Sequence, residues 1–164
     1  MRIMGIDPGT ASTGVGVLEQ TGNHLHLLQY GVVRTQPGVP AARRLLQIYR
    51  EIGALIEKYR PEVMAVEELF FNKNSRTVLA VGQARGVVML AAARENLPVA
   101  EYTPLQVKMA VVGYGRAQKK QVQEMVRVLL GLNRHPKPDD AADALAVAIC
   151  HAHSRRKTDT SGGC

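Results

Sequence analysis

The sequence predicts an α/β protein in which one mixed sheet carries helices on both faces. Three strand-like segments follow one another at the start of the chain, as in an antiparallel meander. Later, short apolar runs alternate with segments of helical periodicity, as in parallel strands joined by helices. The 164 residues suffice for one domain, and 46% of them are hydrophobic, which is enough for a sizeable core.

The meander is predicted from strands over residues 3–6, 14–18 and 24–35. Asp7-Pro8-Gly9-Thr10 forms a turn after the first strand, and Thr21-Gly22-Asn23 turns the chain back after the second. Strands joined by such short connections pair antiparallel.

The next segments alternate helix and strand. Leu45, Ile48 and Ile52 begin an apolar stripe at helical spacing, and the helix stops before Pro61. An apolar run over 63–66 predicts a buried strand, residues 77–94 predict a helix rich in small side chains, and 99–102 predict a further strand. The pattern therefore predicts two parallel strands beside the meander.

Three helices are predicted after the last strand. Thr103-Pro104 is typical of a helix N-cap and first position, so we expect a short helix to residue 111. Further helices are expected over 117–130 and 139–153. We therefore expect a single domain over 1–153 and a disordered polar tail over 154–164.

Charge and hydropathy indicate which partners and which cellular location the sequence favours. The net charge of +7 comes from 21 Lys and Arg against 14 Asp and Glu, and it suits a polyanionic partner, although many basic proteins are merely soluble. Neither a membrane span of about 20 apolar residues nor a signal peptide is predicted, so we expect a cytoplasmic protein that does not bind a membrane. Cys150 and Cys164 form no disulfide framework or zinc motif.

Four carboxylates are candidates for catalysis. Asp7 and Glu67 each end a predicted strand, and the carboxyl ends of strands are where ligands bind in α/β sheets. Asp140 and Asp143 lie about one turn apart on one helix face. Each position has a structural alternative: Asp7 fits an Asx turn, and acids such as Asp140 in a first helical turn stabilise the helix dipole.

Together the four carboxylates would form an all-oxygen site. Such ligands suit Mg²⁺, with Mn²⁺ as a substitute, and serve zinc poorly. A pair of such cations supports phosphodiester hydrolysis without a protein nucleophile. The five histidines form no comparable cluster.

Six motifs carry a resemblance to a known family. They are, in order, Gly5-Ile6-Asp7-Pro8-Gly9, Val66-Glu67, Gly82-Gln83-Ala84-Arg85-Gly86, Gln106-Val107-Lys108, Val111-Val112-Gly113 and Asp140-Ala141-Ala142-Asp143-Ala144-Leu145-Ala146. In order and spacing, over about residues 2–153, they resemble the RuvC family of Holliday-junction resolvases. The resemblance implies an RNase H-like fold, two Mg²⁺ ions on Asp7, Glu67, Asp140 and Asp143, and cutting of four-way DNA junctions in recombination and repair. Some relatives have histidine where Asp140 stands.

A group of basic residues is a candidate for DNA binding: Lys108, Arg116, Lys119 and Lys120. Lys119 and Lys120 fall near the start of a predicted helix, where cations are unfavourable unless an anion such as phosphate lies nearby. A solvated helix face is the alternative. The resemblance implies DNA contacts for Lys108 and Lys119.

Two adjacent aromatic residues follow Glu67. On an extended backbone Phe70 and Phe71 cannot both point inward, so one should pack in the core while the other stacks on an unpaired base. The resemblance favours Phe70 as the exposed ring. Arg76 is a further candidate for contact with the DNA backbone.

Three alternatives to a junction-cutting endonuclease remain open. An RNase H-type nuclease acting on RNA–DNA hybrids shares the fold, and substrate choice separates the two. An actin-like ATPase or sugar kinase would also explain Asp7-Pro8-Gly9-Thr10, but it needs two such domains. A non-catalytic nucleic-acid-binding module would leave the carboxylates as an unexplained electrostatic cost.

Symmetric cutting of a junction requires two active sites, so we expect a two-fold homodimer. Gly82, Gln83, Gly86 and Met89 are the candidate interface, although this face can equally pack on its own sheet. The resemblance also implies a junction-binding protein and a branch-migration motor as partners.

Overall fold

The computed structural model describes residues 1–69 and 75–160, with side chains described up to residue 154 and from residue 77 in the second segment. Its sheet has five strands in the order β3-β2-β1-β4-β5. β1, β2 and β3 form the antiparallel meander, and β4 and β5 continue the sheet parallel to β1. The strands are β1 (Arg2–Asp7), β2 (Ser12–Thr21), β3 (His24–Arg34), β4 (Val63–Glu67) and β5 (Val99–Tyr102).

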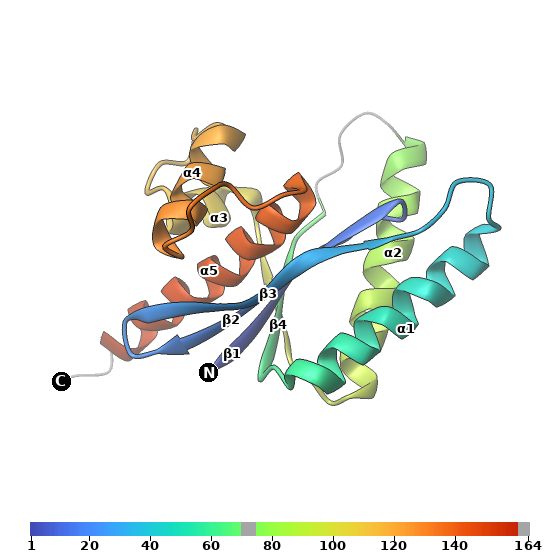
Figure 1. Ribbon diagram of the computed structural model, residues 1–164, viewed down its shortest axis with the longest axis horizontal. Coiled ribbons are helices and arrows are strands. Elements are labelled where there is room, and N and C mark those ends of the chain that lie inside the picture. The colour runs from blue at the N-terminus through green and yellow to red at the C-terminus, as the bar shows by residue number, and fades with distance from the viewer. Residues whose placement is uncertain (70–74, 161–164) are drawn as a thin grey trace.

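Helices cover both faces of the sheet, which confirms the predicted fold class (Figure 1). Two helices pack on one face and three on the other, with α5 lying against the strands. On the first face are α1 (Ala41–Tyr59) and α2 (Ser75–Arg94), and on the second are α3 (Pro104–Val111), α4 (Lys119–Leu129) and α5 (Asp139–Thr160).

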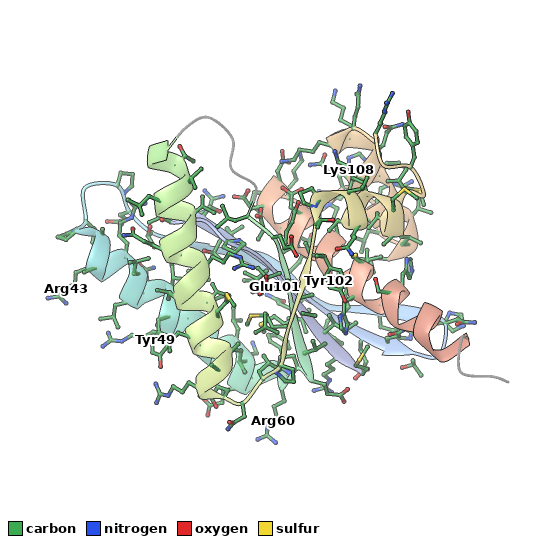
Figure 2. The ribbon with its side chains drawn as sticks, turned by 180° about the vertical axis from the view of Figure 1, so that it is seen from behind. Arg43, Tyr49, Arg60, Glu101, Tyr102 and Lys108 are labelled. Atoms are coloured by element: carbon green, nitrogen blue, oxygen red, sulfur yellow. The ribbon has the colours of Figure 1, made fainter. Side chains whose placement is uncertain are left out.

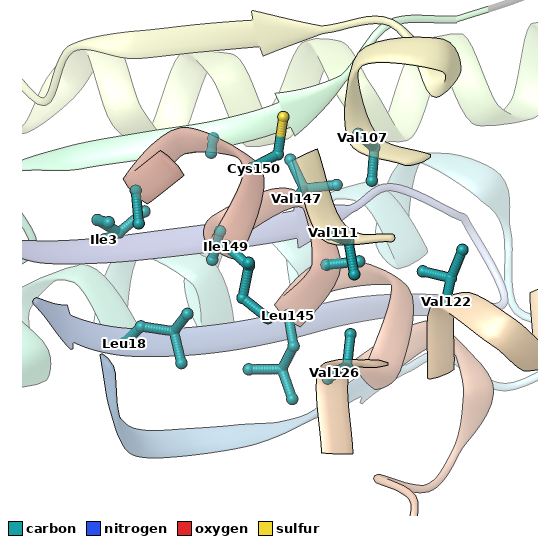
Figure 3. Packing of buried hydrophobic residues seen from close by; sticks show 14 of the residues in the cluster. Ile3, Leu18, Val107, Val111, Val122, Val126, Leu145, Val147, Ile149 and Cys150 are labelled. Carbon is teal, nitrogen blue, oxygen red and sulfur yellow. The ribbon is translucent and has the colours of Figure 1, made fainter. Parts of the chain in front are cut away.

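Two hydrophobic cores lie on either side of the sheet because strand side chains alternate in direction. Ile3 and Leu18 face α5, whereas Met4 and Val66 face α1 and α2. Figure 3 shows the α5 side, where α5 packs between the strands and the helices α3 and α4. Residues 144–150 of α5 are all buried, so this helix is held from several sides.

The start of α4 and the end of α5 differ from the sequence-based expectations. α4 begins at Lys119, two residues later than predicted, because Gln118 adopts extended backbone and forms a capping box with Gln121. By contrast, α1 ends at Tyr59, before Pro61 as predicted, and Arg60 takes the left-handed conformation as its C-cap. The backbone of α5 runs to Thr160, beyond residue 153 where the helix was expected to end, and the sequence has no glycine or proline over 154–160 to end it.

Within the described residues, no helix combines the length and the apolar character that crossing a membrane requires.

Candidate active site

Glycines on β1 and β2 allow the start of α5 to lie directly against the sheet. A Cβ atom at Gly14 would overlap the carbonyl oxygen of Asp140, and one at Gly5 would overlap that of Ala144. A side chain at Gly16 would meet Leu145, at 2.5 Å from its Cδ2. This close approach brings the first turns of α5 beside the carboxyl end of β1.

Sequence reasoning missed the role of Gly14 and Gly16. The sequence does carry a signal for this contact. Gly14 and Gly16 are two apart on a predicted strand and so share one face, and the last predicted helix is rich in alanine, which permits close packing.

Three of the four predicted carboxylates come together at this junction. Asp7 ends β1, while Asp140 and Asp143 project from the first turns of α5. Each offers a carboxylate oxygen, and these oxygens all lie within 4.8 Å of one another. All three residues are partly buried. The arrangement holds the oxygens at the spacing of a metal-binding cluster.

Glu67 lies beside this cluster at the end of β4. β4 runs parallel to β1, with Val66 opposite Ile6, so Glu67 reaches the same edge of the sheet as Asp7. It falls outside the group of oxygens within 4.8 Å. It lines, with Asp143, Lys108 and Lys119, a hollow of about 210 Å³ that we call the lysine hollow.

Burial and mutual repulsion raise the pKa values of these carboxyl groups. Burial, and then the charges of Asp143, Asp140 and Glu67, raise the pKa of Asp7 to about 7. Burial and the charge of Asp143 also raise the pKa of Glu67, and burial raises that of Asp143. A cation placed among them would offset both the loss of hydration of the buried carboxylates and the repulsion between them. Packing by neutral side chains would offset neither.

Lys119 supplies part of this positive charge. Its Nζ lies 3.1 Å from Oδ2 of Asp143 and 3.8 Å from Oδ2 of Asp139. Burial lowers the pKa of Lys119, but the hydrogen bond and charge of Asp143 outweigh this, and the net shift is upward. Lys119 is thus bound to the carboxylate cluster instead of pointing freely at solvent.

Only some of the predicted basic residues line the lysine hollow. Lys108 of α3 lines the lysine hollow on the α5 side of the sheet (Figure 2). Arg116 and Lys120 are exposed and do not line this hollow. Phe70 and Phe71 lie outside the described residues, as does the side chain of Arg76, whose backbone belongs to α2.

The turn that carries Asp7 is fixed by a buried threonine. Thr13 Oγ1 donates a 2.6 Å hydrogen bond to the carbonyl oxygen of Gly9, and the Gly9 N–H donates to Thr13 Oγ1 at 3.4 Å. Among the described residues, no hydrogen-bond donor reaches the Asp7 carboxylate. The Asx-turn alternative for Asp7 therefore has no support in the structure.

The donor set fits a hard divalent cation. The cluster contains oxygen ligands alone, and no histidine or cysteine belongs to it. Oxygen ligands of this kind suit Mg²⁺ or Mn²⁺, and the raised pKa values show that the surrounding protein does not fully compensate the charge of these carboxylates.

Comparisons with known proteins give a consistent result. The family model described as "Crossover junction endodeoxyribonuclease RuvC" matches residues 3–151. Proteins of that name from Pelotomaculum thermopropionicum and Desulfitobacterium hafniense are 63% and 60% identical to the chain. The first alignment covers 93% of each protein and the second 99% of each.

A solved structure shows the same architecture. The structure "T. thermophilus RuvC in complex with Holliday junction substrate" superimposes with a TM-score of 0.91 at 41% sequence identity. The superposition covers 96% of each chain. Sequence and fold therefore lead to the same set of relatives.

Proposed function

The chain belongs to the RuvC family, and we propose that it is a crossover junction endodeoxyribonuclease that resolves Holliday junctions by paired nicks. The observation that carries this proposal is the cluster of Asp7, Asp140 and Asp143 at the edge of an RNase H-like sheet. The Thermus thermophilus relative, which shares this fold, was solved with a Holliday junction substrate.

We propose that Asp7, Glu67, Asp140 and Asp143 hold two Mg²⁺ ions in the active site. Cations held by these carboxylates would lower the pKa of a bound water, so that it could act as the nucleophile, and would offset the negative charge on the leaving oxygen. The donor set supports this assignment because it contains oxygen ligands alone.

The protein's own residues prepare the site for a DNA strand. Asp7 releases its proton near neutral pH, because burial and neighbouring carboxylates raise its pKa to about 7. Lys119 bonds to Asp143 at the edge of the cluster, where with cations bound its ammonium group would be available to a backbone phosphate. Lys108, in the same hollow as Glu67, binds phosphate next to the site.

We further propose that two copies of the chain pair through α2. Ala84, Val88, Ala91 and Ala92 of this helix are buried against its own core, so they cannot form the interface. The opposite face is open: Leu79 and Leu90 are 65% and 60% exposed. Gln83 is exposed, and a Cβ at Gly86 would meet no atom within 4 Å.

This exposed stripe of Leu79, Gln83, Gly86 and Leu90 follows helical spacing along α2. It offers a self-complementary surface with a small residue at its centre, where two helices can approach closely. It retains Gln83 and Gly86 of the predicted patch and adds two leucines. Gly82 and Met89 of that patch are only partly exposed.

Substrate preference tests the proposed function. Purified protein is incubated with Mg²⁺ and a labelled four-way junction, a linear duplex and an RNA–DNA hybrid. We expect symmetric nicks in the junction and little cutting of the other two. Efficient hybrid cleavage with an intact junction would instead identify an RNase H-type nuclease.

A further inference from the structure

A second hollow adjoins the carboxylate cluster, and we call it the Arg44 hollow. Its volume is about 510 Å³, and its walls include Thr10, Ser12, Arg44 and Asp140. It reaches the cluster through Asp140, whereas the lysine hollow reaches it through Asp143 and Glu67. The two hollows share no lining residue. The carboxylates are therefore approached by two separate hollows.

Arg44 is held in place by a chain of hydrogen bonds. Its Nε donates to Thr35 Oγ1 at 2.7 Å, and Thr35 Oγ1 donates to the carbonyl oxygen of Thr10 at 2.6 Å. Thr10 Oγ1 in turn donates to the carbonyl oxygen of Ala80 on α2 at 3.0 Å. This chain ties α1, the Asp7 turn and α2 together around the hollow.

The rest of the Arg44 guanidinium group has no partner among the described residues. No carboxylate lies within 4.0 Å of it, although other arginines in the described part of the chain pair with acids, namely Arg2, Arg85, Arg94 and Arg127. Both terminal nitrogens remain able to donate, in the forked geometry that suits phosphate oxygens. Arg44 is therefore held in place with N–H donors that can bind an anion.

Two neighbouring features also favour an anion here. The first turn of α1 contains no acidic residue, its N-cap Pro40 offers no side-chain hydrogen bond, and it carries Arg43 and Arg44 (Figure 2 shows Arg43). Cations at a helix N-terminus are unfavourable without a counter-ion. In addition, Ser12 Oγ is buried without a hydrogen-bond partner among the described residues. A phosphate would satisfy both groups.

We propose that the Arg44 hollow binds a backbone phosphate of the cleaved DNA strand, next to the scissile phosphate and opposite the lysine hollow. This inference rests on the proposed function. Arg44 then supplies the charge and Ser12 a hydroxyl donor, so the strand is held on both sides of the carboxylates. Arg44 acts as a positioning residue that orients the strand without touching the reacting atoms.

The salt dependence of junction binding tests the charge contact. Arg44→Gln removes the charge but keeps an N–H that can bond to Thr35, and Arg50→Gln makes the same change on an exposed residue of α1 outside the hollow. Without divalent metal, we expect Arg44→Gln to lower the slope of log affinity against log salt by about 0.9, and Arg50→Gln to leave it unchanged. Equal slopes for wild type and folded Arg44→Gln would overturn the proposal.

A phosphate-by-phosphate experiment locates the contact. Junctions are made with one neutral methylphosphonate at each position around the cut, and single-turnover cleavage is measured. At one position beside the scissile phosphate, the neutral methylphosphonate should slow cleavage by wild type about tenfold or more. The same methylphosphonate should not slow cleavage by Arg44→Gln relative to its rate on the unmodified junction. Additive losses at every position would exclude the subsite. Ser12→Ala, which keeps the Arg44–Thr35 bond, is analysed in the same way should Arg44→Gln fail to fold.

The unmodified junction separates this proposal from the function on which it rests. If wild-type protein does not cut that junction, the proposed function fails. If wild type cuts it and no position couples to Arg44 or Ser12, only the phosphate subsite is wrong.

Discussion

At the scale of single residues, the clearest consequence of burying Asp7 beside other carboxylates is that it holds its proton to a higher pH. Its pKa rises from 3.8 to about 7, chiefly through burial and then through three neighbouring acids. Between these two pH values the folded protein holds a proton that the unfolded chain has lost. Stability without metal therefore falls as pH rises from about 4 to about 7.

Asp7→Asn should remove much of this pH dependence. In EDTA, the variant should unfold at a higher denaturant concentration than wild type at pH 8, by a few kcal/mol, and match it more closely at pH 5. Mg²⁺ at pH 8 should stabilise wild type more than the variant. Denaturant titrations at both pH values measure this. If the stability of the two proteins changed with pH in parallel, the pKa of Asp7 would not be raised in the folded protein.

Lys119 and Lys120 are adjacent but should differ in effect. Each alanine substitution should lower the salt slope of junction binding by about 0.9 if each residue contacts one phosphate. Only Lys119→Ala should also destabilise the metal-free protein, because Asp143 loses its 3.1 Å partner. Binding titrations and thermal unfolding measure the two effects. Equal loss of metal-free stability in Lys120→Ala would contradict the role given to Lys119.

Residue types in the sequence predicted the acidic ligands, but not their spacing or pairing. Strand ends at Asp7 and Glu67, and the one-turn spacing of Asp140 and Asp143, indicated a common edge. Nothing in the sequence placed Lys119 against Asp143, because that contact depends on how α4 packs against α5. For the same reason Arg44 went unnoticed, because its neighbours in the hollow come from β2, α2, α5 and the turn after Asp7.

At the scale of elements, the site depends on how closely α5 approaches β1 and β2. A Cβ atom at Gly14 meets the backbone of Asp140, which a rotamer change cannot relieve. A Cβ at Gly31, a strand residue of β3, meets no atom within 4 Å. The two glycines therefore form a matched pair for testing this contact.

Gly14→Ala should displace the start of α5 and separate its aspartates from Asp7. We expect a loss of stability of roughly 1–3 kcal/mol and loss of Mg²⁺-dependent cutting, because overpacking moves the metal ligands. Gly31→Ala should change stability and Mg²⁺-dependent cutting little. Denaturant unfolding and junction cleavage measure both properties. Normal cleavage by Gly14→Ala would show that the helix position is not critical.

Periodicity located the described elements well, and their ends less well. The amphipathic stripe of α1 and the apolar run of β4 are strong local signals. Helix ends depend on caps such as Gln118, whose capping box with Gln121 is rarer than the serine or threonine type. The close packing of α5 on glycines is a tertiary contact, which periodicity does not report.

At the scale of the whole molecule, the described residues of one chain provide one carboxylate cluster, and two symmetric cuts need two clusters. We expect sedimentation at micromolar concentration to give a dimer mass. Leu90→Glu should shift this mass toward the monomer, because it places charge on the exposed stripe of α2, whereas the same change at exposed Leu105 of α3 should not. A dimer unaffected by Leu90→Glu would place the interface elsewhere.

The central claim is that the carboxylate cluster cuts four-way DNA junctions with Mg²⁺. The most direct measurement compares wild type with Asp7→Asn on a labelled junction, recording both binding and cleavage. Asp7→Asn should bind the junction as tightly as wild type or more tightly, because a negative charge is removed, and should make no nicks at any Mg²⁺ concentration. Substantial Mg²⁺-dependent cutting by Asp7→Asn protein would contradict the claim.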